Sequence, residues 1–141
     1  MKVFFDTNVL LNGPFNEPGG QASDQCITLC SNRVHVGWIA WHTLSNAHYI
    51  VRARSKSKST ALQFITDLLA WAEVAETAKT DALAAIGSGM PDFEDALQAA
   101  AALACGADLI LTRNLVDFKN STVPAMTPED FLSRLAVTPA P

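Results

Sequence analysis

Two short apolar runs, about a hundred residues apart, end abruptly on polar residues. Val3–Phe5 is followed by Asp6, and the apolar run within residues 107–112 is followed by Arg113 and Asn114. A strand that is apolar throughout, without alternation, is typical of a parallel sheet buried on both faces. A third strand is predicted at 34–39. These strands predict an α/β fold: a three-layer α/β/α sandwich with a mainly parallel central sheet.

Segments with helical periodicity separate the predicted strands, as the crossovers of a parallel sheet require. Gly106 is the natural stop of the long alanine-rich segment before it, and Pro128 opens the last one. Residues 74–75 are predicted to be a short extended link, and 123–126 an edge strand. The helices are predicted at residues 24–32, 41–54, 61–72, 81–86, 92–105 and from 128 onward.

The length and composition fit one globular domain, expected over residues 1–135, with a flexible tail at 136–141. The chain has 141 residues, of which 49% are apolar and 17% charged, which excludes the composition of a disordered chain. No apolar run approaches the ~18 residues of a membrane span, and no signal peptide is recognisable, so we expect a cytoplasmic protein without membrane contact. The three cysteines lack the spacing of a zinc site and are expected to be reduced thiols.

Polar residues follow the ends of two predicted strands. Asp6 follows the first strand, and Thr112, Asn114 and Asp117 lie at or just past the end of the strand predicted within residues 107–112. Ligands in open parallel sheets bind beyond the carboxyl ends of the strands. We therefore expect these residues at one edge of the sheet.

The helix predicted at 92–105 adds further acids near its start. Asp92 and Asp95 are three residues apart and share a face, whereas Glu94 is expected to point elsewhere. Asp6, Asp92, Asp95 and Asp117 would repel one another in one cleft unless a divalent cation lay among them. Oxygen ligands of this kind suit Mg²⁺ or Mn²⁺. The alternatives are that Asp92 only caps the helix, that Asp95 faces water and that Asp117 serves only its turn.

The stretches "FFDTNVLLN" and "PDFEDALQAAAALACGADLILTRNLVDF" resemble the PIN domain, and most closely the VapC-type toxin ribonucleases. The resemblance runs from Val3 to about Leu132. It implies a metal-dependent nuclease that cuts RNA, a small antitoxin protein as partner and a homodimer. By position, Asp6, Asp95 and Asp117 match the catalytic and metal-binding acids of the family. Asn8, Thr112 and Asn114 match supporting polar positions.

One position departs from the family pattern. The family usually has a glutamate in the helix after the second strand, where this chain has Asn46 in "WHTLSNAHYIV". An asparagine offers an amide oxygen but no charge, so the departure bears on metal affinity. Asp92 is a candidate to offset the missing charge.

A basic stretch follows the helix that carries Asn46. Although the net charge is −4, no acid occurs between Asp24 and Asp67, and phosphate contacts are expected from Arg52, Arg54, Lys56 and Lys58. The alternative is a solvated helix end, where cations suit the helix dipole. Trp38, Trp41 and His48 are expected to pack in the core rather than stack on bases.

Two other functions compete with a nuclease. An aspartate after the first strand is also the nucleophile of haloacid-dehalogenase-like phosphatases, but Asn8 and Leu10 stand where their Asp-x-Asp-x-Thr pattern has Asp and Thr. A non-catalytic RNA- or protein-binding module, weakened as an enzyme by Asn46, is the other alternative.

Overall fold

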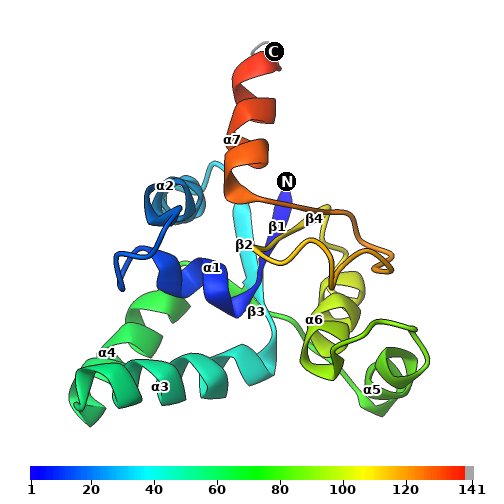
Figure 1. Cartoon of the computed structure of the whole chain (residues 1–141), viewed down its shortest axis with the longest axis horizontal. Coiled ribbons are helices and arrows are strands. Elements are labelled where there is room, and N and C mark those ends of the chain that lie inside the picture. Colours follow the sequence, from blue (N-terminus) through cyan, green and yellow to red (C-terminus); the bar gives the residue numbers. More distant parts are fainter. Residues whose placement is uncertain (139–141) are drawn as a thin grey trace.

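The computed structural model describes residues 1–138, which form five strands and seven helices (Figure 1). In chain order they are β1 (Lys2–Phe5), α1 (Thr7–Asn12), α2 (Gly20–Ser31), β2 (Val36–Ile39), α3 (Trp41–Ser55), α4 (Lys58–Leu69), β3 (Ala72–Val74), α5 (Lys79–Ile86), α6 (Phe93–Ala104), β4 (Leu109–Leu111), β5 (Ala125–Met126) and α7 (Pro128–Val137).

All the strand pairs are parallel, and the sheet has the order β3-β2-β1-β4-β5. The chain builds outward from β1 through β2 to β3, then crosses back to place β4 on the other side of β1. The order therefore reverses between β1 and β4. In open parallel sheets a ligand binds beyond the strand ends at such a reversal. The structure confirms the predicted α/β class and the mainly parallel sheet.

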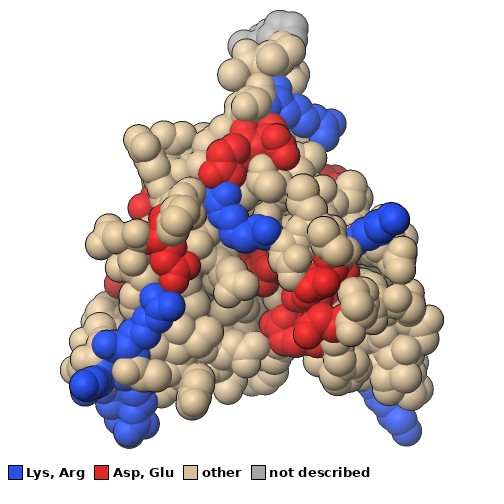
Figure 2. Space-filling model, in the orientation of Figure 1, with Lys and Arg blue, Asp and Glu red and all other residues tan. Residues whose placement is uncertain are grey.

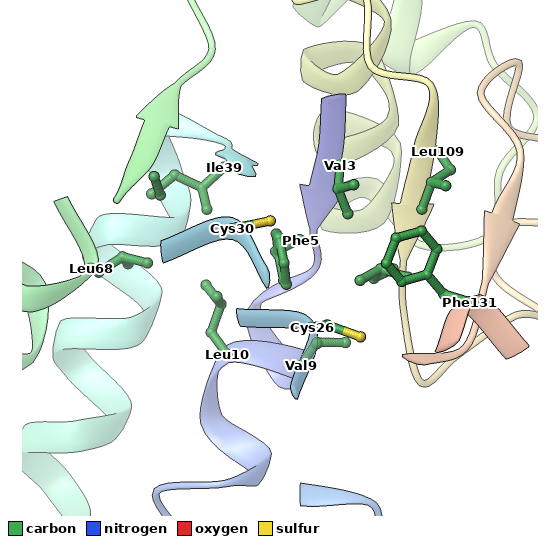
Figure 3. Packing of buried hydrophobic residues seen from close by; sticks show 12 residues of the cluster. Val3, Phe5, Val9, Leu10, Cys26, Cys30, Ile39, Leu68, Leu109 and Phe131 are labelled. Carbon is green, nitrogen blue, oxygen red and sulfur yellow. The ribbon is translucent and has the colours of Figure 1, made fainter. Parts of the chain in front are cut away.

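The side chains of β1 alternate between two cores, one on each face of the sheet. Val3 and Phe5 pack with residues of α1, α2, α4 and α7, including Phe131 (Figure 3). Phe4 packs on the opposite face, among the alanines of α6 and Ile110. All three β1 side chains have no exposed surface. Burial on both faces explains why β1 is apolar throughout, and it fixes the three layers.

Helix α1 is the main element that the sequence did not predict. It begins directly after β1, with Asp6 in extended conformation as its first flanking residue. Val9 and Leu10 are buried beside β1, so tertiary packing supports a helix of only six residues. The predicted link at 74–75 is instead β3 at Ala72–Val74, paired with β2.

The remaining differences are shifts of element ends. Helix α2 begins at Gly20, ahead of the predicted residue 24. Helix α4 begins at Lys58 rather than 61, because the Ser57 hydroxyl accepts a hydrogen bond from the Thr60 amide and caps the helix there. Helix α7 runs to Val137, so residues 136 and 137 of the expected tail are helical. Residues 139–141 of that tail lie outside the described part of the chain. No helix within residues 1–138 is long and apolar enough to cross a membrane.

Candidate metal centre

Asp6 lies at the reversal of the sheet, and its carboxylate is held from two sides. Its backbone amide donates to the Leu111 carbonyl at 3.0 Å, which anchors the end of β1 to β4. The Thr112 hydroxyl donates to Asp6 Oδ2 at 2.8 Å, and Gln98 Nε2 donates to Oδ1 at 2.7 Å. Asp6 is only 3% exposed, and Thr112 and Gln98 are completely buried. The orientation of this carboxylate is therefore fixed by β4 and α6.

The first turn of α6 brings two more carboxylates to Asp6. One carboxylate oxygen from each of Asp6, Glu94 and Asp95 lies within 4.8 Å of the other two. Asp92 is the N-cap of α6, and its Oδ1 accepts a hydrogen bond from the Asp95 amide at 2.9 Å. That cap starts the helix at Phe93, so it decides which way Glu94 and Asp95 project. Among residues 1–138, this is the group of acids compact enough to hold a metal ion.

Glu94 is held by three side chains from two helices, contrary to the prediction that it points elsewhere. His42 Nε2 lies 3.2 Å from Glu94 Oε1, and Asn46 Nδ2 donates to the same oxygen at 3.3 Å. Gln98 Nε2 contacts Oε1 at 3.0 Å and Oε2 at 3.1 Å. Glu94 and Asp95 occupy adjacent positions of α6, and both line the cleft. Asn46 therefore has an acid beside it, supplied by α6 and not by its own helix.

The three carboxylates differ in their affinity for a proton. Burial, the hydrogen bond to Glu94 and the negative charges of Asp6, Glu94 and Asp92 raise the pKa of Asp95 from 3.8 to about 8. Burial also raises the pKa of Asp6, and it outweighs the bonds from Gln98 and Thr112. Burial acts to raise the pKa of Glu94 as well, but the hydrogen bonds from His42, Gln98 and Asp95 outweigh it and lower that pKa. Without a cation, Asp95 thus carries a proton at neutral pH while Glu94 is ionised.

The three acids open into a cleft of about 490 Å³. Asn8 lies on its rim and is exposed. One wall is a face of α3. The lining residues are Asp6, Thr7, Asn8, Ser45, Asn46, Tyr49, Ile50, Glu94 and Asp95. Figure 2 shows acidic side chains gathered beside α6.

The turn after β4 contributes Thr112 to this site but directs its other polar residues elsewhere. Asp117 lies outside the group of three acids, and its Oδ2 accepts a hydrogen bond from the Asn114 side chain in the same turn. The backbone N–H of Asn114 donates a hydrogen bond to the Thr112 hydroxyl oxygen at 3.0 Å. This bond orients the hydroxyl toward Asp6. Asp92 also lies outside the group, in its capping role.

Arg113 turns away from the cleft and ties this turn to α2 and α7. Its guanidinium donates to Asn12 at 2.9 Å, to the Gly19 carbonyl at 2.5 Å and to Ser23 at 2.8 Å, and it pairs with Glu129. Gly19 has φ +82°, and a Cβ there would lie 2.6 Å from the guanidinium carbon. Glycine is therefore required where α2 begins, and Arg113 fixes the position of Thr112 from behind.

The four basic residues of the predicted phosphate-binding stretch lie beyond the cleft, where α3 ends and α4 begins. All four are exposed. Figure 2 shows the cations at the lower left, across a neutral strip from the acids. Arg54 pairs with Glu17 at 3.0 Å and lies over the Phe15 ring at 4.4 Å. The set Arg52, Arg54, Lys56 and Lys58 thus lies at the junction of α3 and α4, outside the lining of the cleft.

Gln98 and His42 contact the acids of the site but were not predicted from the sequence to do so. Gln98 is three residues after Asp95 and four after Glu94, so extending the helical spacing by one turn would have indicated it. His42 precedes Asn46 by four residues on α3, but nothing in the sequence indicates that its partner is on α6.

The comparisons with known proteins agree with this geometry. A search of curated proteins finds no match. The VapBC2 structure from Rickettsia felis, bound to a DNA fragment from their promoter, matches with a TM-score of 0.70 and 18% identity, covering 90% of this chain and 98% of that chain. The VapBC-1 structure from nontypeable Haemophilus influenzae matches with a TM-score of 0.67 and 17% identity, covering 92% and 99%.

At these identities the two solved structures establish a shared fold. The family comparison goes further, because the model of the PIN domain matches residues 2–116, which include β1, the acidic turn of α6 and Thr112. The chain therefore belongs to the PIN domain family.

Proposed function

We propose that this protein is a divalent-metal-dependent endoribonuclease, the toxin of a VapBC-type pair. The observation that carries the proposal is the group formed by Asp6, Glu94 and Asp95 in an open cleft at the reversal of the sheet. Membership of the PIN domain family and the similarity in fold to two VapBC structures support it. The RNA substrate, a small antitoxin partner, a homodimer and a cytoplasmic location are part of the same proposal.

The residues present fit a hard divalent cation such as Mg²⁺ or Mn²⁺. Three carboxylates within 4.8 Å supply oxygen ligands. Burial is the largest cause of the raised pKa of Asp95, and the negative charges of Asp6, Glu94 and Asp92, which a cation would offset, add to it. Asp6, Glu94 and Asp95 would hold the ion. Asp6 is oriented by Thr112 and Gln98, and Glu94 by His42 and Asn46, as metal-ligand carboxylates are generally held by outer hydrogen bonds.

The proposed reaction is hydrolysis of a phosphodiester: water attacks phosphorus, the bond to the leaving sugar oxygen breaks, and a carboxylate takes the proton of the water. A divalent cation held by Asp6, Glu94 and Asp95 would polarise the phosphate and lower the pKa of the attacking water. Hydrogen bonds from His42, Gln98 and Asp95 lower the pKa of Glu94 and keep it ionised, as a ligand or a general base must be. Its Oε2 accepts a hydrogen bond from Gln98 at 3.1 Å, whereas His42 and Asn46 contact Oε1.

Glu94 takes the place of the acid that the family usually has on α3. Asn46 stands at that position and donates to Glu94, so the negative charge reaches the same part of the cleft from α6. The structure thus favours Glu94 over Asp92 as the residue that offsets the substitution, since Asp92 is occupied as the cap of α6.

The test is cleavage of RNA by purified protein with Mg²⁺ or Mn²⁺, comparing wild type with Asp6→Asn and Asp95→Asn. Asp67→Asn is the matched control, because Asp67 is an exposed acid on α4. Among residues 1–138, its carboxylate accepts a hydrogen bond only from the Gln63 side chain. We expect both site variants to lose cleavage and the control and wild type to cut alike. Equal cleavage by all four proteins would identify a contaminating nuclease and reject this site.

Calorimetric titration with Mn²⁺ separates the enzyme from the non-catalytic alternative. An enzyme should bind the ion through Asp6 and Asp95 and lose that binding in either variant. RNA binding without cleavage, together with no metal binding at millimolar concentration, would instead favour a binding module. A covalent aspartyl-phosphate on Asp6 would favour the phosphatase alternative.

A further inference from the structure

An exposed aromatic side chain stands in the wall of the acidic cleft. Tyr49 lines the cleft together with Asn46 and Ile50, and it is 74% exposed. A tyrosine this exposed contributes little to the core. Its ring is available to a ligand in the same cleft as the three acids.

The register of α3 places this ring close to the acids. Tyr49 follows Asn46 by three residues, so the two side chains are neighbours on the helix surface, about one turn or ~5 Å apart along the axis. Asn46 in turn donates to Glu94 at 3.3 Å. Tyr49 therefore lines the cleft from a position one helical turn along α3 from the residue that contacts Glu94.

Beyond Tyr49 the same helix becomes basic. Arg52 is three residues further along and exposed, and Lys56 follows at the C-cap of α3. Moving along α3 away from the acids, a ligand meets an aromatic ring and then positive charge, in the direction of the cations at the lower left of Figure 2. A single RNA strand offers the complementary order: a phosphate, a base and further phosphates.

We propose that Tyr49 is the stacking platform for one unpaired base of the substrate, next to the phosphate that a cation held by the acids would engage. The proposal deepens the proposed ribonuclease function and rests on it. Aromatic side chains bind single-stranded nucleic acid by stacking on the faces of bases, which a duplex keeps within its own stack. Tyr49 thereby makes the cleft selective for single-stranded segments of RNA.

Trp41 provides a matched control for this assignment. It is 71% exposed, contrary to the expectation that it packs in the core, and it lies at the start of α3. It lines a small hollow of about 60 Å³ formed with α5 and α6 rather than the acidic cleft. Loss of this ring tests whether any exposed aromatic residue on α3 has the same effect.

The experiment measures binding apart from cleavage. A fluorescently labelled short single-stranded oligoribonucleotide is titrated with Asp6→Asn protein carrying in addition Tyr49→Ala, Tyr49→Phe or Trp41→Ala, with anisotropy as readout. We expect Tyr49→Ala to weaken binding roughly 5- to 100-fold, the usual range for loss of one base–aromatic stack. Tyr49→Phe and Trp41→Ala should stay within about twofold of the parent.

A series of oligonucleotides with one abasic position identifies the stacked base. If Tyr49 stacks on one base, the loss of RNA affinity caused by Tyr49→Ala should vanish when that base is absent. The loss should persist when any other base is absent, as in a double-mutant cycle. In the cleaving protein, Tyr49→Ala should raise KM far more than it lowers kcat.

Three results would overturn the proposal: Tyr49→Ala binding within twofold of the parent, an equal loss for Tyr49→Phe, or an equal loss for Trp41→Ala. The anisotropy titrations measure RNA binding and do not depend on cleavage. If wild type fails to cut RNA, the ribonuclease function fails on its own while the abasic series still decides whether Tyr49 stacks on a base.

Discussion

The first turn of α6 and the turn after β4 both carry acids to the same edge of the sheet, yet only α6 completes the acidic site. Glu94 and Asp95 meet Asp6 because a capped helix fixes their direction and because α3 and β1 supply their partners. Asp117 bonds with Asn114 inside its own turn, while Arg113 reaches to α2 and α7. An acid in a loop can be satisfied locally, whereas acids at a buried helix start depend on what packs against them.

Substituting an acid should have a much larger effect in the first turn of α6 than in the turn after β4. Glu94→Gln should lower Mn²⁺ affinity and RNA cleavage by at least about 100-fold, because loss of a ligand exceeds the roughly 10- to 100-fold cost of losing an outer partner. Asp117→Asn should change either quantity by less than about threefold, since Asp117 lies outside the group. Calorimetry and cleavage rates measure both. A large loss for Asp117→Asn would show that this turn rearranges to join the site.

The buried amide that joins two of the acids should have the next largest effect. Gln98→Leu removes the donor that Asp6 and Glu94 share, and we expect Mn²⁺ affinity to fall roughly 10- to 100-fold. Gln63→Leu, at an exposed glutamine on α4, is the control and should leave affinity unchanged. Titration calorimetry of both variants measures the difference. Unchanged affinity in Gln98→Leu would mean that Asp6 and Glu94 hold their orientation without it.

The raised pKa of Asp95 should make metal binding depend on pH. Because the pKa of Asp95 is raised to about 8, a cation must displace its proton, and affinity should rise about fivefold between pH 7 and pH 8. Without metal, the folded state holds a proton that the unfolded state releases above about pH 4. The stability of the metal-free protein should therefore fall as pH rises toward and through 8.

Thermal unfolding of metal-free protein from pH 6 to pH 9 checks that sign, with Asp95→Asn as the comparison. The variant cannot lose a proton at this position, so its melting temperature should vary less with pH. A metal-free wild type that becomes more stable over the same range would contradict the raised pKa.

The smallest effect is expected from the imidazole at Glu94. His42 is partly exposed, and it shares Glu94 Oε1 with Asn46 and Gln98, so His42→Ala should lower Mn²⁺ affinity by only about threefold. His48→Ala, on the same helix outside the lining of the cleft, is the matched control. A loss in His42→Ala as large as that in Glu94→Gln would show that His42 itself binds the ion.

The sequence predicted the parts of the site that depend on strand ends and on spacing within one helix. Asp6 and Thr112 follow from apolar strands that stop on polar residues, and Asp95 follows from its place near the start of a helix. The cap at Asp92 was one of the alternatives that the sequence left open. Helix α1 could not be predicted with the same means, because six residues form a helix there only with the support of packing on β1.

By itself, the sequence determined the layered α/β fold and the edge of the sheet where polar groups gather, because burial on both faces demands apolar strands and their polar ends mark the edge. Only the tertiary structure decided which acids meet. Glu94 meets Asn46 because α3 and α6 border the same cleft, and Asp117 stays apart because Asn114 satisfies it. These contacts depend on the distances between helices and strands that are far apart in the chain. The spacing of residues within one helix or strand does not encode those distances.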